Sequence, residues 1–187
     1  MQENMQQDVQ MQEKVKYHGL YDWMQTIVMT LLAVLTLLTF VGRNIGVDGD
    51  SMNPTLLDGD RMIVRSLFYA PNHGDIVVVS TQSFREGKPL VKRVIALAGE
   101  VVEIDTTRGV VYVNGIALDE PNFEPTFEMG DITYPYTVPD GHIFVIGDNR
   151  NASNDSRFVE IGPIDEREII GGAMAVFFPF TRAQILR

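Results

Sequence analysis

The feature that most constrains the fold is an uncharged run of twenty residues near the N-terminus, residues 23–42. At roughly 1.5 Å per residue, a helix of this length is about 30 Å long, which is the thickness of a bilayer's hydrocarbon core. Tyr21 and Trp23 at the start of the run are typical of the aromatic belt at a membrane surface. We therefore predict one transmembrane α-helix over residues 23–42, preceded by a tail of residues 1–22 and followed by a separate domain of residues 43–187.

Two other interpretations of this run are a buried core helix and a cleaved leader segment. A cleaved leader has a shorter apolar stretch and ends in a triplet of the Ala-x-Ala type, and residues 36–42 contain no such triplet. We therefore favour an uncleaved anchor. Lys14 and Lys16 precede the run and only Arg43 directly follows it, so the excess of positive charge predicts a cytoplasmic N-terminus and an extracytoplasmic domain.

Composition excludes several classes of function. The chain has 15 Lys and Arg against 25 Asp and Glu, and a nucleic-acid partner would require a basic face instead. There is no cysteine, which rules out disulfides, a thiol nucleophile and a Cys-ligated metal. His18, His73 and His142 are scattered and show no zinc-ligand spacing. We expect no metal, no cofactor and no nucleic acid.

The segment after the anchor has the pattern of short β-strands. Runs rich in β-branched residues are bounded by turn residues, and Asn114-Gly115 is typical of a type I′ hairpin turn. Several prolines and a glycine mark a loop-rich stretch over residues 119–140. The pattern alone predicts an all-β sandwich or barrel. The predicted strands are 61–65, 75–79, 90–97, 110–113, 116–118, 141–146 and 169–178.

Three dense motifs stand out within this domain. Ser51 lies in Gly-Asp-Ser-Met-Asn-Pro-Thr, and Lys92 lies in Val-Lys-Arg-Val-Ile-Ala-Leu-Ala-Gly-Glu. The third motif, residues 147–157, reads Gly-Asp-Asn-Arg-Asn-Ala-Ser-Asn-Asp-Ser-Arg and directly follows the apolar run 143–146. Polar density directly after a buried strand is typical of a site built on a strand end.

The chemistry of Ser51 depends on a base, because a serine hydroxyl is a poor nucleophile until its proton is removed. No histidine lies in a supporting motif, whereas a lysine can act if its amine is neutral. At the ordinary pKa of about 10.4, about one amine in a thousand is neutral near neutral pH, and lowering the pKa to about 8 costs roughly 3 kcal/mol. Lys92 shares a strand face with Leu90, Val94 and Ala96, which favours the neutral form. The alternative is an edge-strand lysine that limits aggregation.

In order and content, these motifs resemble the signature motifs of the type I signal peptidases, Ser/Lys proteases that cut signal peptides from exported proteins. The likeness runs from about Gly49 to Gly162. It implies a β-rich catalytic domain of two antiparallel sheets. It also implies a single-pass protein of the cell membrane whose partners are membrane lipid and secretory preproteins, cut after a small residue in an Ala-x-Ala-like context. The length and Gly49 resemble the short, single-span form typical of Gram-positive bacteria.

The resemblance assigns Ser51 as the nucleophile and Lys92 as the general base. It implies that Ser153 hydrogen-bonds and orients the Lys92 amine. Two supporting ion pairs are implied, Asp155 with Arg157 and Asp148 with Arg93. Without the resemblance, residues 148–150 read equally well as a polar turn.

Substrate pockets are implied less strongly, with Ile45, Val47 and Met52 as lining residues. Two positions depart from the family pattern. Ala98 replaces the usual proline of Leu-Pro-Gly-Glu, which loosens a turn. Gly49 stands where some members have a serine that stabilises the oxyanion, so the Ser51 backbone N–H needs a second donor that the sequence does not identify.

Two rival functions fit part of the pattern. A self-cleaving Ser/Lys repressor-type protease uses the same catalytic pair, but it needs a DNA-binding domain where this chain has a membrane span. A membrane-tethered β module that only binds exported proteins would tolerate loss of Ser51 or Lys92, and both motifs are intact. A penicillin-recognising enzyme is excluded, because Met-Asn-Pro follows Ser51 and no Ser-x-x-Lys is formed.

Overall fold

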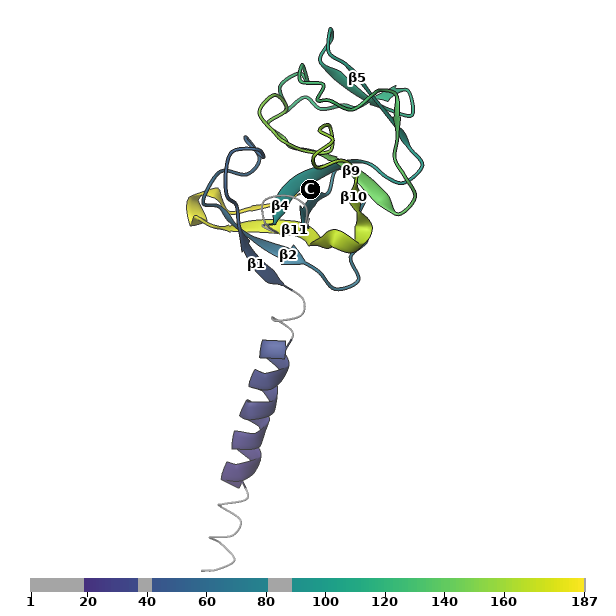
Figure 1. Ribbon diagram of the computed structural model, residues 1–187. Helices are drawn as coiled ribbons and strands as arrows, with labels where there is room; N and C mark the ends of the chain where they lie inside the picture. The colour runs from purple at the N-terminus through teal and green to yellow at the C-terminus, as the bar shows by residue number, and fades with distance from the viewer. Residues whose placement is uncertain (1–18, 37–41, 81–88, 187) are drawn as a thin grey trace, which may run out of the picture. The chain divides into compact units, whose positions relative to one another are not determined.

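The computed structural model describes residues 19–36, 42–80 and 89–186 (Figure 1). The chain divides into two units, residues 1–40 and residues 41–187, and each is described by itself. Most of the predicted tail, with Lys14, Lys16 and His18, lies outside the described residues. Residues 37–41 of the predicted span lie outside them as well.

The described part of the first unit is one α-helix, Gly19–Thr36. By length and composition it can cross a membrane, and none of it is buried in the structure. The Thr26 hydroxyl donates to the carbonyl of Asp22 one turn earlier, which satisfies this polar group within the helix (2.8 Å). The helix already includes residues 19–22, and Gly42 at the other end of the predicted span is not helical.

The second unit is β-rich, as predicted, and its larger sheet has eight strands that pair antiparallel throughout. The order is β1-β2-β11-β3-β4-β9-β10, and β12 also pairs with β11. Exposed residues alternate with buried ones along β2, whereas β3 and β4 in the centre are buried on both faces. The strands are β1 (Arg43–Gly46), β2 (Arg61–Arg65), β3 (Ile76–Val79), β4 (Leu90–Ala96), β9 (His142–Ile146), β10 (Ile164–Asp165), β11 (Ile169–Phe178) and β12 (Gln184–Ile185).

The smaller sheet has four antiparallel strands in the order β7-β6-β5-β8. They are β5 (Val101–Asp105), β6 (Val110–Val113), β7 (Ile116–Ala117) and β8 (Tyr136–Thr137). Asn114 and Gly115 both have positive φ (53° and 75°), which is the type I′ geometry that the Asn-Gly pair predicts. Two short 3₁₀ helices, η2 (Glu166–Glu168) and η3 (Phe180–Arg182), flank β11.

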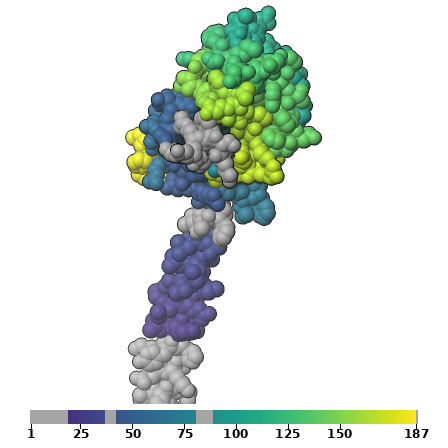
Figure 2. Space-filling view, viewed as in Figure 1, coloured from purple at the N-terminus to yellow at the C-terminus, as the bar shows by residue number. Residues whose placement is uncertain are grey.

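The domain core follows from this layering. Ile76 and Val78 of β3 belong to one buried cluster, and Val77 and Val79 belong to another, so both faces of the central strand are covered. A third cluster includes the buried residues of β5 and β6 and those at the end of β9. In the space-filling view, the teal and green surface of the smaller sheet and its loops caps one end of the domain (Figure 2). The third motif directly follows β9 and is thereby fixed to the core.

Candidate active site

Ser51 is held by a turn that is anchored in the core. It follows β1, and the intervening Val47 exchanges backbone hydrogen bonds with Gly59 and Asp60 (3.0 and 2.8 Å). The N–H of Leu56 donates to the carbonyl of Met52 (2.9 Å), which closes a helical turn directly after Ser51. Met52 and Leu56 are both fully buried in the core beneath this turn. The serine backbone is therefore positioned by packing as well as by hydrogen bonds.

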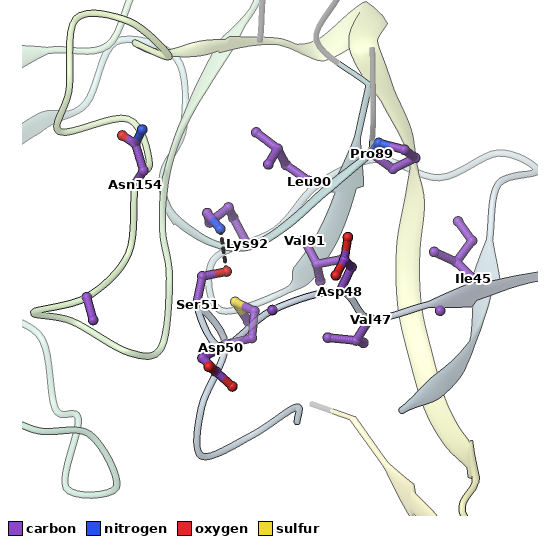
Figure 3. Close-up of a pocket in the computed structure, with 14 residues that line it drawn as sticks. Ile45, Val47, Asp48, Asp50, Ser51, Pro89, Leu90, Val91, Lys92 and Asn154 are labelled. Atoms are coloured by element: carbon purple, nitrogen blue, oxygen red, sulfur yellow. Dashed lines mark hydrogen bonds between the residues drawn. The ribbon is translucent and has the colours of Figure 1, made fainter. Parts of the chain in front are cut away.

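Lys92 lies on β4, between β3 and β9, and its side chain is 3% exposed. Its Nζ lies 2.7 Å from Ser51 Oγ, which is a hydrogen bond across 41 positions of sequence (Figure 3). A charged amine donates to the hydroxyl, whereas a neutral amine can accept the hydroxyl proton. Burial penalises the charged form and so favours the base. The pair has the distance that proton transfer to a general base requires.

Asn149 fixes both peptide groups that flank the serine. Its backbone N–H donates to the carbonyl of Ser51, and its side-chain Nδ2 donates to the carbonyl of Asp50, each at 3.1 Å. No described residue accepts from the backbone N–H of Ser51. That N–H is therefore available to stabilise an oxyanion.

Arg93 and Asp148 form a bidentate ion pair. Nε donates to Oδ1 at 2.7 Å and Nη2 donates to Oδ2 at 2.6 Å. Both residues are buried, and Nη1 also donates to the carbonyl of Gly74. The pair links β4, which carries Lys92, to the start of the third motif. Loss of either partner would leave a buried charge uncompensated.

Asp155 and Arg157 form a second bidentate pair, with neither residue accessible to solvent. Asp155 Oδ2 accepts from the N–H of Gly147 at 3.0 Å. Arg157 Nη1 donates to the carbonyls of Glu128 and Arg150, so the pair ties the loop 119–140 and the third motif together. Close by, burial raises the pKa of the Tyr134 hydroxyl above its usual range, and Asp155 adds to the effect while Arg157 opposes it.

Ser153 is buried, but its Oγ makes no hydrogen bond to a described residue. The hydrogen bond to the Lys92 amine implied by the resemblance is therefore not formed in this structure, where Nζ is bonded to Ser51. Ser153 nevertheless packs at the site. A Cβ added to Gly147 would lie 2.1 Å from Ser153 Oγ and 2.4 Å from the carbonyl oxygen of Ser51.

A cavity of about 350 Å³ opens beside the Ser51–Lys92 pair. Ile45, Val47 and Met52, the three residues expected from the sequence, all line it. Pro89 and Leu90 also line it, and Figure 3 shows them on the Lys92 side of the cavity. The sequence reasoning did not single out these two residues, although Leu90 directly precedes the Val-Lys-Arg motif and shares the face of Lys92.

The described histidines lie elsewhere. His73 Nε2 is hydrogen-bonded to Glu100 at 2.6 Å, and His142 Nδ1 is 2.9 Å from the carbonyl of Asp140. The pKa of Glu100 is lowered: partial burial works against this, but hydrogen bonds from the Leu97 N–H and from His73 outweigh it. Neither histidine contacts Ser51 among the described residues, so the arrangement fits a lysine base and not a histidine base.

Comparison with known proteins shows which family the chain resembles. Residues 20–178 match the family described as "Signal peptidase, peptidase S26". The chain is 39% identical over 166 residues to a probable signal peptidase I-1 of Synechocystis, covering 83% of this chain and 81% of that protein. It is 34% identical over 178 residues to signal peptidase I of Bacillus licheniformis, covering 88% and 92% of the two chains.

A solved signal peptidase I from Enterococcus faecalis is also similar. It has 31% sequence identity and a TM-score of 0.46, over 55% of this chain and 96% of that one.

Proposed function

Because the chain belongs to the signal peptidase I family of peptidase S26, we propose that it removes signal peptides with Ser51 as nucleophile and Lys92 as general base. The family assignment makes it a hydrolase that acts on preproteins. The observation that carries the catalytic assignment is the 2.7 Å contact between Lys92 Nζ and Ser51 Oγ at the edge of an apolar cavity.

The reaction follows from this pair. Lys92 Nζ takes the Ser51 proton as Oγ attacks the scissile carbonyl, and the Ser51 N–H stabilises the resulting oxyanion. The protonated Lys92 then gives its proton to the leaving amine, which departs as the N-terminus of the mature protein. Lys92 then takes a proton from water as the water oxygen attacks the acyl carbon, and it returns this proton to Ser51 Oγ as the ester bond breaks, which releases the signal peptide with a free carboxylate.

The supporting residues act by holding this pair in place. The Arg93–Asp148 pair fixes β4 to the third motif, and the Asp155–Arg157 pair fixes Gly147 beneath Ser51. Ser153 Oγ, buried and without a hydrogen bond to the described residues, is available to the amine once Ser51 has been acylated.

The lining of the cavity supports a preference for small side chains before the scissile bond. Val47 and Met52 are buried residues of the core cluster, so the apolar wall that they form cannot recede to admit a large side chain. Ile45 and Leu90 add apolar surface. An Ala-x-Ala-like sequence fits such a shallow, apolar site.

The test is cleavage of a preprotein by the full-length protein in detergent, followed by sequencing of the new N-terminus. We expect one new N-terminus directly after an Ala-x-Ala triplet, and no product with the Ser51→Ala protein. Product formation by Ser51→Ala, or cleavage at unrelated sites, would contradict the proposal.

The N-terminal helix supports membrane anchoring, since its apolar side chains are exposed along its whole described length. Such a surface is stable in a bilayer and not in water. The positive charges before the helix favour a cytoplasmic N-terminus, with the catalytic domain outside the cytoplasm, where signal peptides emerge.

Protease accessibility tests this topology. We expect protease added to intact spheroplasts to digest the domain after Gly42 and to spare a tag fused at Met1. Digestion of the tag together with protection of the domain would show that the orientation is the reverse of the proposed one. Detergent lysis provides the control, because both parts should then be digested.

A further inference from the structure

A second cavity, of about 280 Å³, lies beside Ser51 and shares no lining residue with the first. Its wall comes from three short segments: Asn53 and Pro54 just after the serine, Asn122 and Glu124 in the loop 119–140, and residues 148–150 of the third motif. Along the segment that carries Ser51, the residues up to Met52 line the first, apolar cavity, and Asn53 and Pro54 line the second, polar one.

The position of the second cavity relative to Ser51 is set by hydrogen bonds. Asn149, which lines it, donates from its backbone and side chain to the carbonyls of Ser51 and Asp50. If the residues before the scissile bond occupy the apolar cavity, the chain that continues past Ser51 runs toward the polar one. The residues immediately after the bond are the first residues of the mature protein.

The wall of this cavity is prearranged by an aromatic residue between two arginines. The ring of Phe123 stacks on the guanidinium groups of Arg93 (5.1 Å) and Arg150 (4.8 Å). Arg150 is buried and forms a bidentate ion pair with Glu120, which precedes Phe123 in the same loop. These contacts hold Asn122 and Glu124 against the third motif without a ligand.

The side chains that line this cavity leave an excess of negative charge. Arg93 is paired with Asp148 and Arg150 with Glu120, whereas the exposed Glu124 has no ion pair among the described residues. The exposed Asp50 lines the first cavity, and it is linked to the lining of the second one because Asn53 Nδ2 donates to its carboxylate at 3.4 Å.

An accessible acceptor in this cavity is the Glu124 carboxylate. Asn53 Oδ1 accepts no hydrogen bond from a described residue, but it is buried and therefore closed to a ligand in this structure. The cavity therefore presents negative charge, which complements groups that donate hydrogen bonds.

We propose that this cavity is a subsite for the first two residues of the mature protein, and that it favours basic or amide side chains over acidic ones. The inference rests on the proposed function, because it places the scissile bond at Ser51. Glu124 is the specificity-determining residue in this account, and Phe123 positions the loop that carries it.

A set of capped peptides tests the proposal. All share the same residues up to the scissile bond, and the first or second residue after it is Lys, Gln or Glu. For the full-length protein in detergent at low salt, we expect kcat/KM to be about five- to tenfold higher with Lys than with Glu, because attraction to an exposed carboxylate in one peptide is replaced by repulsion in the other. The ratio should shrink in high salt, which screens such contacts.

Variants of Glu124 assign the preference to the cavity. Glu124→Gln should reduce the Lys-to-Glu ratio to about twofold or less, and Glu124→Lys should reverse the preference, since each change removes or inverts one charge contact. Glu103→Gln is the matched control: it removes the same charge from an exposed position on β5, and the ratio should remain that of the wild type.

The outcomes separate the subsite from the function. Cleavage of all peptides with equal kcat/KM, or a preference that Glu124→Lys leaves unchanged, overturns the subsite and leaves the peptidase assignment intact. Failure of the wild-type protein to cut any peptide overturns the proposed function itself. A Glu103→Gln effect equal to that of Glu124→Gln would mean that overall charge, and not this cavity, sets the preference.

Discussion

Replacing Ser51 or Lys92 with alanine is expected to abolish preprotein cleavage, with a loss of about a thousandfold or more for each change. Ser51→Ala removes the attacking oxygen. Lys92→Ala removes the only described side chain that contacts this oxygen in the hydrogen-bonding geometry of a base. The two residues act as one unit, so the double variant should be no worse than either single variant. Initial rates on one preprotein substrate measure the loss.

The matched control for Lys92 is methionine. It keeps an unbranched apolar side chain in a position that is 3% exposed, so the fold is preserved while the amine is lost. Circular dichroism and thermal unfolding should stay close to those of the wild type for Lys92→Met and Ser51→Ala. More than a few per cent of activity in Lys92→Met would mean that another group takes the proton.

Gly147→Ala is expected to lower kcat by about a hundredfold or more, although it adds only one methyl group. The new Cβ would lie 2.4 Å from the carbonyl oxygen of Ser51 and 2.1 Å from Ser153 Oγ. Ser51 is held by Asn149 and by the buried turn beneath it, so relief of the clash must displace the nucleophile from Lys92. The kinetics of a peptide substrate, with circular dichroism as a check on folding, measure this effect.

A second variant separates the clash with the Ser51 carbonyl from the clash with the Ser153 side chain. Gly147→Ala combined with Ser153→Gly removes the clash with the Ser153 side chain but keeps the clash with the Ser51 carbonyl. If displacement of Ser51 is the cause, the double variant should remain as impaired as Gly147→Ala. Recovery to more than about a tenth of wild-type kcat would assign the defect to Ser153 instead.

Much of the fold could be predicted from local patterns. The bounds of β2 and β11 coincide with the predicted runs, because β2 has the apolar centre Met-Ile-Val between two arginines and β11 contains no polar side chain. β1 was missed because Arg-Asn-Ile-Gly contains a single large apolar residue, and it becomes a strand by pairing with β2. β5 was missed although its residues alternate between buried and exposed, because Glu103 and Asp105 interrupt its short apolar run. The two-residue strands β8, β10 and β12 are too short for any periodicity.

The candidate site was predictable in its residue types but not in its packing. Motifs single out Ser51 and Lys92, but their contact across the sheet depends on the pairing of β4 with its neighbours. The crowding at Gly147 depends on how the third motif folds back on Ser51, and no local pattern encodes such a contact. The Ser153–Lys92 hydrogen bond, which only the family resemblance implied, also depends on this packing and is not formed in the structure.

The pH dependence of kcat/KM on a peptide with Ala-x-Ala before the scissile bond tests the lysine mechanism most directly. Only a neutral Lys92 amine can accept the Ser51 proton, and burial favours that form. The rate should therefore rise with pH through one ionisation well below the ordinary lysine pKa of about 10.4. Lys92→Arg should be inactive throughout, since a guanidinium remains charged. A limb at the ordinary histidine pKa of about 6.5 that disappears when His73 or His142 is replaced would contradict the Ser51–Lys92 mechanism.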